Sequence, residues 1–109
     1  MKHITIEGNA VSLAAYRCPD ATVYMRMILC KFRDTPGADT LTLDTIEPSM
    51  RRSINALLAT SEFENITMSD VRTRTISEAD KALWEPNFDD DDYGDVSEKT
   101  VFELLKPSA

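Results

Sequence analysis

The densest run of hydrophobic residues lies at positions 22–32, within a longer stretch, residues 22–46, on which we expect the core to assemble. Apolar side chains occupy both sets of alternating positions in residues 22–32, which is typical of a strand buried on both faces. A helix is the alternative, because Pro19 lies where a first helical turn accepts proline. The β-branched and aromatic content favours the strand, so we predict a strand here and keep the helix open.

Two runs near the N-terminus predict a β-hairpin. Residues 3–7 and 11–15 both place apolar side chains at every second position, and the pair Gly8-Asn9 between them is typical of a tight turn. Asn9 can instead cap a helix over residues 10–17. The period of two favours a strand over these residues, with the helix as the alternative.

Two further strands follow later in the chain. Residues 40–46 place leucines on one face and threonines on the other, which is typical of a half-exposed strand. Residues 66–76 alternate as well, but the alternation changes phase at Ser69-Asp70. Such a change of phase indicates a β-bulge or a break in the strand.

Three segments have helical patterns. Residues 49–60 carry apolar side chains at helical spacing and form the main amphipathic helix of the prediction. Ser77 and Asp80 form a partial capping box at the start of a short helix over residues 78–85. A last amphipathic helix is predicted over residues 97–106.

These elements predict one α+β domain over residues 1–109, a length typical of a single domain. We expect a small antiparallel sheet of about four or five strands, packed against the main helix at about residues 49–60. Two short C-terminal helices, the second at residues 97–106, flank an acidic loop at residues 86–96 in this prediction. A chain of this size can bury a core without disulfides or metals.

The acidity of the chain lies in its second half. Residues 1–60 contain six acids and seven bases, a net charge of +1, whereas residues 61–109 contain thirteen acids and five bases, a net charge of −8. A negative surface repels nucleic acids and anionic membranes, so we predict neither as a direct partner. It attracts basic protein surfaces, and it also keeps a small protein in solution whether or not it binds anything.

Reactive side chains are few. His3 is the only histidine, Cys18 and Cys30 have no CxxC spacing, and the chain contains no catalytic, metal-ligating or phosphate-binding motif. We therefore predict a protein that is not an enzyme and that has no cofactor. The start of the chain has no apolar leader and no run reaches the length of a membrane span, so we expect a cytoplasmic protein with reduced thiols.

The spacing of the acidic loop does not match that of a calcium-binding EF-hand loop. An EF-hand register with Gly94 at the turn leaves Tyr93 and Thr100 where the motif needs an oxygen ligand and a bidentate glutamate. We therefore predict no metal site.

The same loop combines acidic and aromatic side chains, with seven acids and no base in the fourteen residues 85–98. Acids steer a basic partner and aromatics anchor it. The predicted partner-binding residues are Trp84, Glu85, Phe88, Asp89, Asp90, Asp91, Asp92, Tyr93, Asp95 and Glu98. The alternative is a solvated acidic loop in which Trp84 and Phe88 belong to the core.

The sequence thus favours a non-enzymatic protein-binding or regulatory module that docks on a basic partner surface through its acidic C-terminal half. Inhibitors and small virus-encoded proteins, such as phage accessory proteins, fit this description. A loop whose carboxylates follow the spacing of backbone phosphates would act as a nucleic-acid mimic. The alternatives are a structural or assembly accessory protein that works as a homo-oligomer, a small enzyme and a weak calcium-binding protein.

Overall fold

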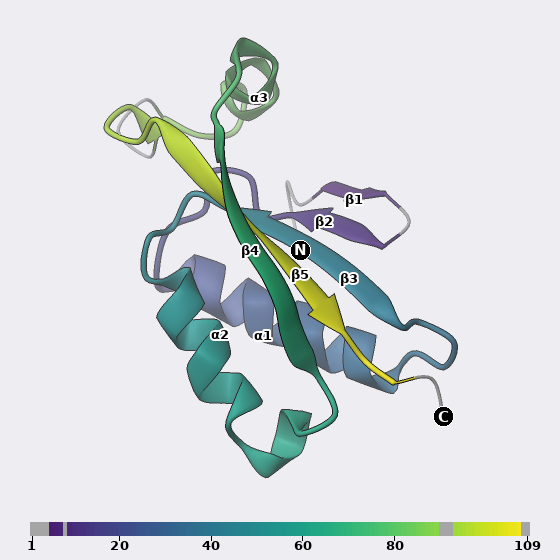
Figure 1. The fold of residues 1–109 in the computed structure, drawn as a ribbon. Coiled ribbons are helices and arrows are strands. Elements are labelled where there is room, and N and C mark those ends of the chain that lie inside the picture. The colour runs from purple at the N-terminus through teal and green to yellow at the C-terminus, as the bar shows by residue number, and fades with distance from the viewer. Residues whose placement is uncertain (1–4, 8, 90–92, 108–109) are drawn as a thin grey trace.

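The computed structural model describes residues 5–7, 9–89 and 93–107 (Figure 1). They form an α+β fold with a five-stranded mixed sheet, three α-helices and a 3-10 turn, η1. The elements in chain order are β1 (Thr5–Glu7), β2 (Ala10–Ser12), α1 (Asp20–Asp34), β3 (Thr40–Thr45), α2 (Met50–Leu58), η1 (Ser61–Phe63), β4 (Thr67–Thr75), α3 (Glu78–Trp84) and β5 (Glu98–Leu105).

The strands lie in the order β1-β2-β3-β5-β4. β1 and β2 form the predicted N-terminal hairpin, in which Glu7 pairs with Ala10, and Ala10–Ser12 is a strand rather than a helix. The prediction of an antiparallel sheet is wrong for one pair of strands, because β2 and β3 are parallel. The chain crosses from β2 to β3 through α1, and such a crossover is what a parallel pair requires.

The predicted strand over residues 22–32 is wrong, because this segment is part of the helix α1. Its buried side chains follow helical spacing, so one face of the helix packs on the sheet while the other meets solvent. These buried residues are Ala21, Met25, Ile28, Leu29 and Phe32. Burial of this face outweighs the strand propensity of the β-branched residues.

The predicted C-terminal helix over residues 97–106 is also wrong, because this segment is the strand β5. β5 pairs antiparallel with β3 on one side and with β4 on the other. Phe102 lies opposite Leu43 and Val71, and Leu104 lies opposite Leu41. The two neighbouring strands therefore decide the conformation of a segment whose local pattern also suits a helix.

The main core lies between the sheet and two helices. Figure 1 shows α1 and α2 on the same face of the sheet. α2 confirms the predicted amphipathic helix, with Met50 and Ile54 buried, and the longer α1 joins it on that face. The most deeply buried side chains of this core include Leu13, Met25, Leu29, Leu43, Met50, Ile54, Phe63, Phe102 and Leu104.

β4 confirms the predicted irregularity, since its pairing with β5 shifts between Met68 and Asp70. The end of β5 is fixed to α1 by Lys106, whose Nζ donates to the carbonyls of Phe32 at 2.6 Å and Thr35 at 2.8 Å. The last carbonyls of a helix lack partners within the helix, so Lys106 acts as a cap from outside it. None of the helices in the described part of the chain is long and apolar enough to cross a membrane.

We predict that Phe102→Ala destabilises the protein by about 3–5 kcal/mol, because it leaves a cavity between the sheet and the helices. Leu105→Ala is the matched control, since Leu105 lies in the same strand but is 41% exposed, and we expect it to cost about 1 kcal/mol or less. Urea unfolding monitored by circular dichroism measures both. Similar losses from the two variants would contradict the central position of β5.

Candidate protein-binding surface

The predicted partner-binding residues that the structure describes lie at the end of the molecule where α3 follows β4 (Figure 1). α3 begins with the capping box that the sequence predicts. The backbone N–H of Asp80 donates to Ser77 Oγ at 3.1 Å, and the backbone N–H of Ser77 donates to Asp80 Oδ2 at 3.0 Å. Both contacts satisfy backbone donors near the start of a helix, so a seven-residue helix has a defined start here.

Two of the predicted aromatic residues are part of a second, smaller core. Trp84 is 4% exposed, Tyr93 is 6% exposed, and their rings meet edge to face with centroids 5.5 Å apart. They pack with Ala14, Ala15, Ile46 and Ile76. Trp84 and Tyr93 therefore hold the loop onto the rest of the protein rather than presenting their rings to a partner.

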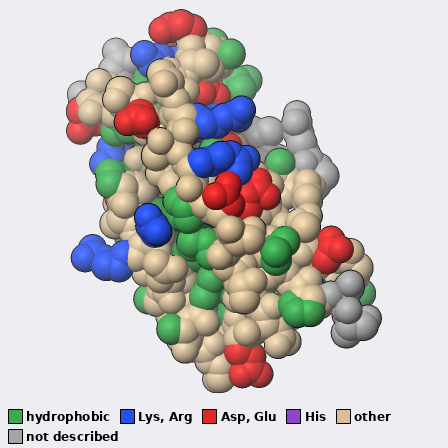
Figure 2. All heavy atoms as spheres, in the orientation of Figure 1, with side chains coloured by type: hydrophobic (Ala, Val, Ile, Leu, Met, Phe, Trp, Pro, Cys, Tyr) green, Lys and Arg blue, Asp and Glu red, His purple; other side chains and the backbone are tan. Residues whose placement is uncertain are grey.

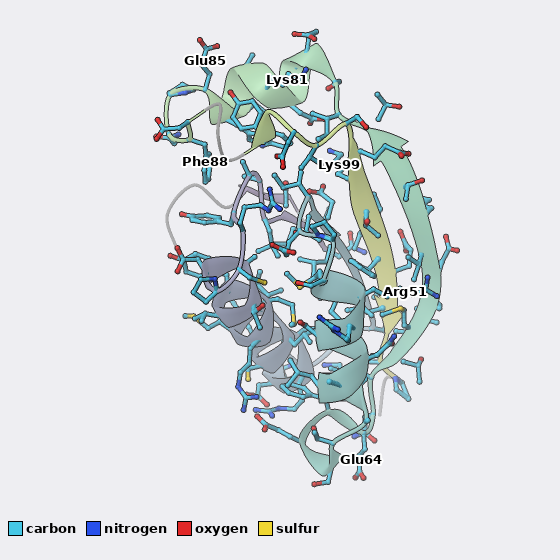
Figure 3. All side chains as sticks on the ribbon, turned by 90° about the vertical axis from the view of Figure 1, so that its left-hand side faces the viewer. Arg51, Glu64, Lys81, Glu85, Phe88 and Lys99 are labelled. Carbon is cyan, nitrogen blue, oxygen red and sulfur yellow. The ribbon has the colours of Figure 1, made fainter. Side chains whose placement is uncertain are left out.

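Phe88 is half-buried and joins a short row of aromatic rings. Its ring centroid lies 4.9 Å from that of Tyr16, and the Tyr16 centroid lies 4.8 Å from that of Tyr24, both edge to face. Figure 3 shows Phe88 on the side of the molecule where α1 begins. Burial and the neighbouring Tyr24 raise the pKa of the Tyr16 phenol. The row links the acidic loop to α1 by apolar contacts.

The predicted acids are on the surface wherever the structure describes them. Glu85, Asp89, Asp95 and Glu98 are all exposed. Asp95 lies 3.7 Å from Arg17 Nη1, a contact at the protein surface. The predicted residues Asp90, Asp91 and Asp92 lie outside the described residues.

Lys99 ties this end of the molecule to the sheet. Its Nζ lies 3.2 Å from Asp80 Oδ1 in α3 and 3.8 Å from Asp44 Oδ2 in β3, and its side chain is 12% exposed. Burial raises the pKa of Asp44, against the hydrogen bond that Ser12 Oγ donates at 2.6 Å. Burial would also raise the pKa of Asp80, but hydrogen bonds from Ser77 and Lys99 outweigh it and lower the pKa. The positive charge of Lys99 is thus balanced by two carboxylates of the same protein.

Glu47 connects the start of α2 to the segment before α1, as Lys99 connects α3 to the sheet. Its Oε1 accepts hydrogen bonds from the backbone N–H of Cys18 at 3.1 Å and from Arg17 Nε at 3.3 Å. Its Oε2 accepts from the backbone N–H and the hydroxyl of Ser49 at 3.1 and 2.9 Å. Burial would raise the pKa of Glu47, but these hydrogen bonds outweigh it and lower the pKa to about 2. Glu47 therefore fixes Arg17, which in turn lies beside Asp95.

Sequence reasoning found the acids of this surface but missed the residues that position it. Tyr16, Arg17 and Glu47 come from the first half of the chain, more than forty positions before Glu98. Glu47 stands directly before Pro48-Ser49, which the sequence marks as the start of a helix. An acidic residue just before a helix start often accepts hydrogen bonds from the first backbone N–H groups of the helix, and this was the local signal for the role of Glu47.

The acidic loop does not have the flanking elements of an EF-hand. In an EF-hand the loop joins two helices, whereas this loop leads from α3 into the strand β5. Within the described ranges, no group of three or more histidine, cysteine, aspartate or glutamate side chains is placed to hold a metal ion.

Comparison with known proteins adds no family. No protein-family model matches the chain, and none of the curated protein sequences matches it significantly.

We predict that Glu47 makes the protein sensitive to acid. Its pKa is lowered from the ordinary 4.5 to about 2, so the stability it contributes is complete above pH 4.5 and is lost as the pH falls towards 2. Glu47→Gln keeps the shape without the charge, and we expect it to cost about 1.5–3 kcal/mol at neutral pH. The unfolding free energy measured in urea between pH 7 and pH 2.5 tests this.

The difference between the wild type and Glu47→Gln should shrink as the pH falls through that window. Glu98→Gln, which removes an exposed carboxylate, is the control and should follow the wild type. A difference that stays constant with pH would contradict the role given to the Glu47 charge.

Proposed function

We propose that this chain is a non-enzymatic protein-binding module that docks on a basic surface of a partner protein. The surface proposed for docking, called the acidic end here, consists of Glu85, Phe88, Asp89, Asp95 and Glu98. The observation that carries the proposal is that the cations Lys99 and Arg17 at this end of the molecule contact buried or half-buried carboxylates, whereas most of the acids lie on the surface. Lys99 is engaged with Asp44 and Asp80, and the single cation Arg17 is shared between Glu47 and Asp95, so the exposed carboxylates of the acidic end outnumber the cations that contact them.

This arrangement of charges follows from the different surroundings of buried and exposed carboxylates. The buried and half-buried carboxylates need a cation or several hydrogen-bond donors to stay ionised, and Lys99 and Arg17 meet that need. The exposed carboxylates are stabilised largely by water, which keeps them charged. Figure 2 shows Asp and Glu side chains, with Lys and Arg side chains among them, at the α3 end of the molecule. A basic partner surface therefore meets an excess of negative charge there.

The neighbouring surface offers apolar contact as well. Phe88 and Tyr16 are half-buried, and Val23 and Met27 on the outer face of α1 are 53% and 50% exposed. Val23 and Tyr24 are adjacent in α1, so the aromatic row leads from the acidic loop to this apolar part of the helix. Charge raises the rate of encounter, and apolar groups that become buried supply most of the affinity.

An inhibitor-like role fits this combination, because a module that covers a basic surface blocks whatever that surface binds. The nucleic-acid-binding site of a partner is one surface of this kind, since such sites are rich in lysine and arginine. Electrostatic steering also predicts the response to salt. A complex formed in this way weakens as ionic strength rises, because the Debye length falls to about 3 Å at 1 M salt.

We predict that Glu85→Gln/Glu98→Gln weakens partner binding about fivefold or more at low salt, because two carboxylates of the acidic end are lost. The control is Asp39→Asn/Glu64→Gln, which removes the same charge elsewhere. Glu64 lies at the opposite end of the molecule from Glu85 (Figure 3), and Asp39 lies between α1 and β3. Quantitative affinity capture from source cells with the three proteins as baits identifies the partner, and titration calorimetry with the purified partner gives Kd.

The acidic-end variant should lose both the captured partner and its salt-dependent affinity, whereas the control should keep them. The proposal is wrong if both variants bind the partner as the wild type does, or if Kd does not change between 50 mM and 500 mM salt.

A further inference from the structure

The outer edge of β4 is the longest strand edge that the described part of the chain leaves open. β4 has nine residues and pairs with β5 on one side, and no described strand pairs with its other side. Figure 3 shows β4 along the margin of the molecule with no helix beyond it. An open edge presents backbone N–H and C=O groups that can pair with another strand.

The side chains of β4 carry opposite charges on one face and an apolar group on the other. Val71 lies opposite Phe102, on the face that packs on α1 and α2, and it is half-buried against the main core. Asp70 and Arg72 lie on the opposite, open face, where Arg72 contacts both Asp70 and Glu103 at 3.1 Å. Figure 2 shows Lys and Arg side chains beside Asp and Glu side chains over the sheet.

We propose that β4 pairs antiparallel with β4 of a second copy, about a two-fold axis that passes through Val71. In this register Val71 lies opposite Val71 of the second copy, and each Asp70 lies opposite an Arg72. The two charge pairs form on the open face, and the two valines meet on the helix face. Opposite charges across two strands stabilise a pair, and like charges destabilise it.

The charges select this register against its neighbours. A two-fold axis at Asp70 would place the two aspartates opposite each other, and an axis at Arg72 would do the same for the two arginines. An axis at Thr73 would place Arg72 opposite Arg74. Only the axis at Val71 avoids like charges at the centre and gives two opposite-charge pairs. The edge is thus complementary to itself.

β4 has features that protect an edge strand from non-specific pairing, and they do not prevent the proposed contact. The irregularity between Met68 and Asp70 and the charged side chains discourage pairing with an arbitrary strand. From Asp70 to Thr75, however, the pairing of β4 with β5 is regular, so the centre of the proposed contact lies on undistorted strand. A specific partner strand must match the charges, and a second copy does.

The contact would join two five-stranded sheets into one and place the two copies of α3 at opposite ends. The inference does not depend on the function proposed above. If both hold, the dimer has two acidic ends that face away from each other, and it can bind two partner surfaces at once. Two linked sites raise the overall affinity for a partner that presents two basic surfaces.

We predict that the wild type sediments with twice the chain mass of 12.3 kDa at micromolar concentrations. Asp70→Arg and Arg72→Asp each place like charges opposite each other, so each should weaken dimerisation about tenfold or more. The double variant Asp70→Arg/Arg72→Asp restores opposite pairs and should restore the dimer. Analytical ultracentrifugation gives the dissociation constants, and circular dichroism confirms that each variant is folded.

Cross-linking tests the register even if a charge variant fails to fold. In a background with Cys18→Ser and Cys30→Ser, Val71→Cys should form a disulfide-linked dimer on mild oxidation, because the two cysteines would face each other. Thr73→Cys is the matched control, since in this register it lies opposite Ser69 and should not cross-link. A wild type that is monomeric at about 100 µM, or equal cross-linking by both cysteines, would overturn the proposal.

Discussion

The pairing of β5 between β3 and β4 is the constraint on which the rest of the structure depends. The last strand in the sequence lies between β3 and β4, so these two strands are not joined until the C-terminal segment is in place. Phe102 and Leu104 then complete the core under α1 and α2, and Lys106 caps α1. Such pairing between distant segments carries a high cost in chain entropy, which burial of these side chains offsets.

The α3 end of the molecule combines largely buried ion pairs with exposed carboxylates. Inside, Lys99 joins α3 to the sheet and Glu47 joins the start of α2 to the segment before α1. Each of these contacts replaces water around a buried charge with a fixed partner. Outside, Asp89 and Asp95 are exposed, and the buried Trp84 and Tyr93 anchor the segments that carry them.

The acidic end and the β4 edge are proposed as recognition surfaces of different physical kinds. The proposed contacts of the acidic end rely on charge at a distance and on a few apolar groups, so they would respond strongly to salt. The proposed contact of the β4 edge relies on backbone hydrogen bonds in a defined register, with charges that would select the partner strand. Because α3 directly follows β4, the edge also determines how two acidic ends would be oriented. A regulatory protein and an assembly protein are therefore compatible roles for this chain.

The sequence by itself determined the elements that have strong local signals. The hairpin, β3, α2, the irregularity in β4 and the capping box of α3 all follow from turn residues, periodicity and caps, which act over a few residues. The excess of acid near the C-terminus was equally plain. Only the tertiary structure decided α1 and β5, because their apolar residues satisfy the periods of both helix and strand. It alone brought Tyr16, Arg17 and Glu47 to the acidic end and buried Trp84 and Tyr93, since these contacts join segments far apart in the chain.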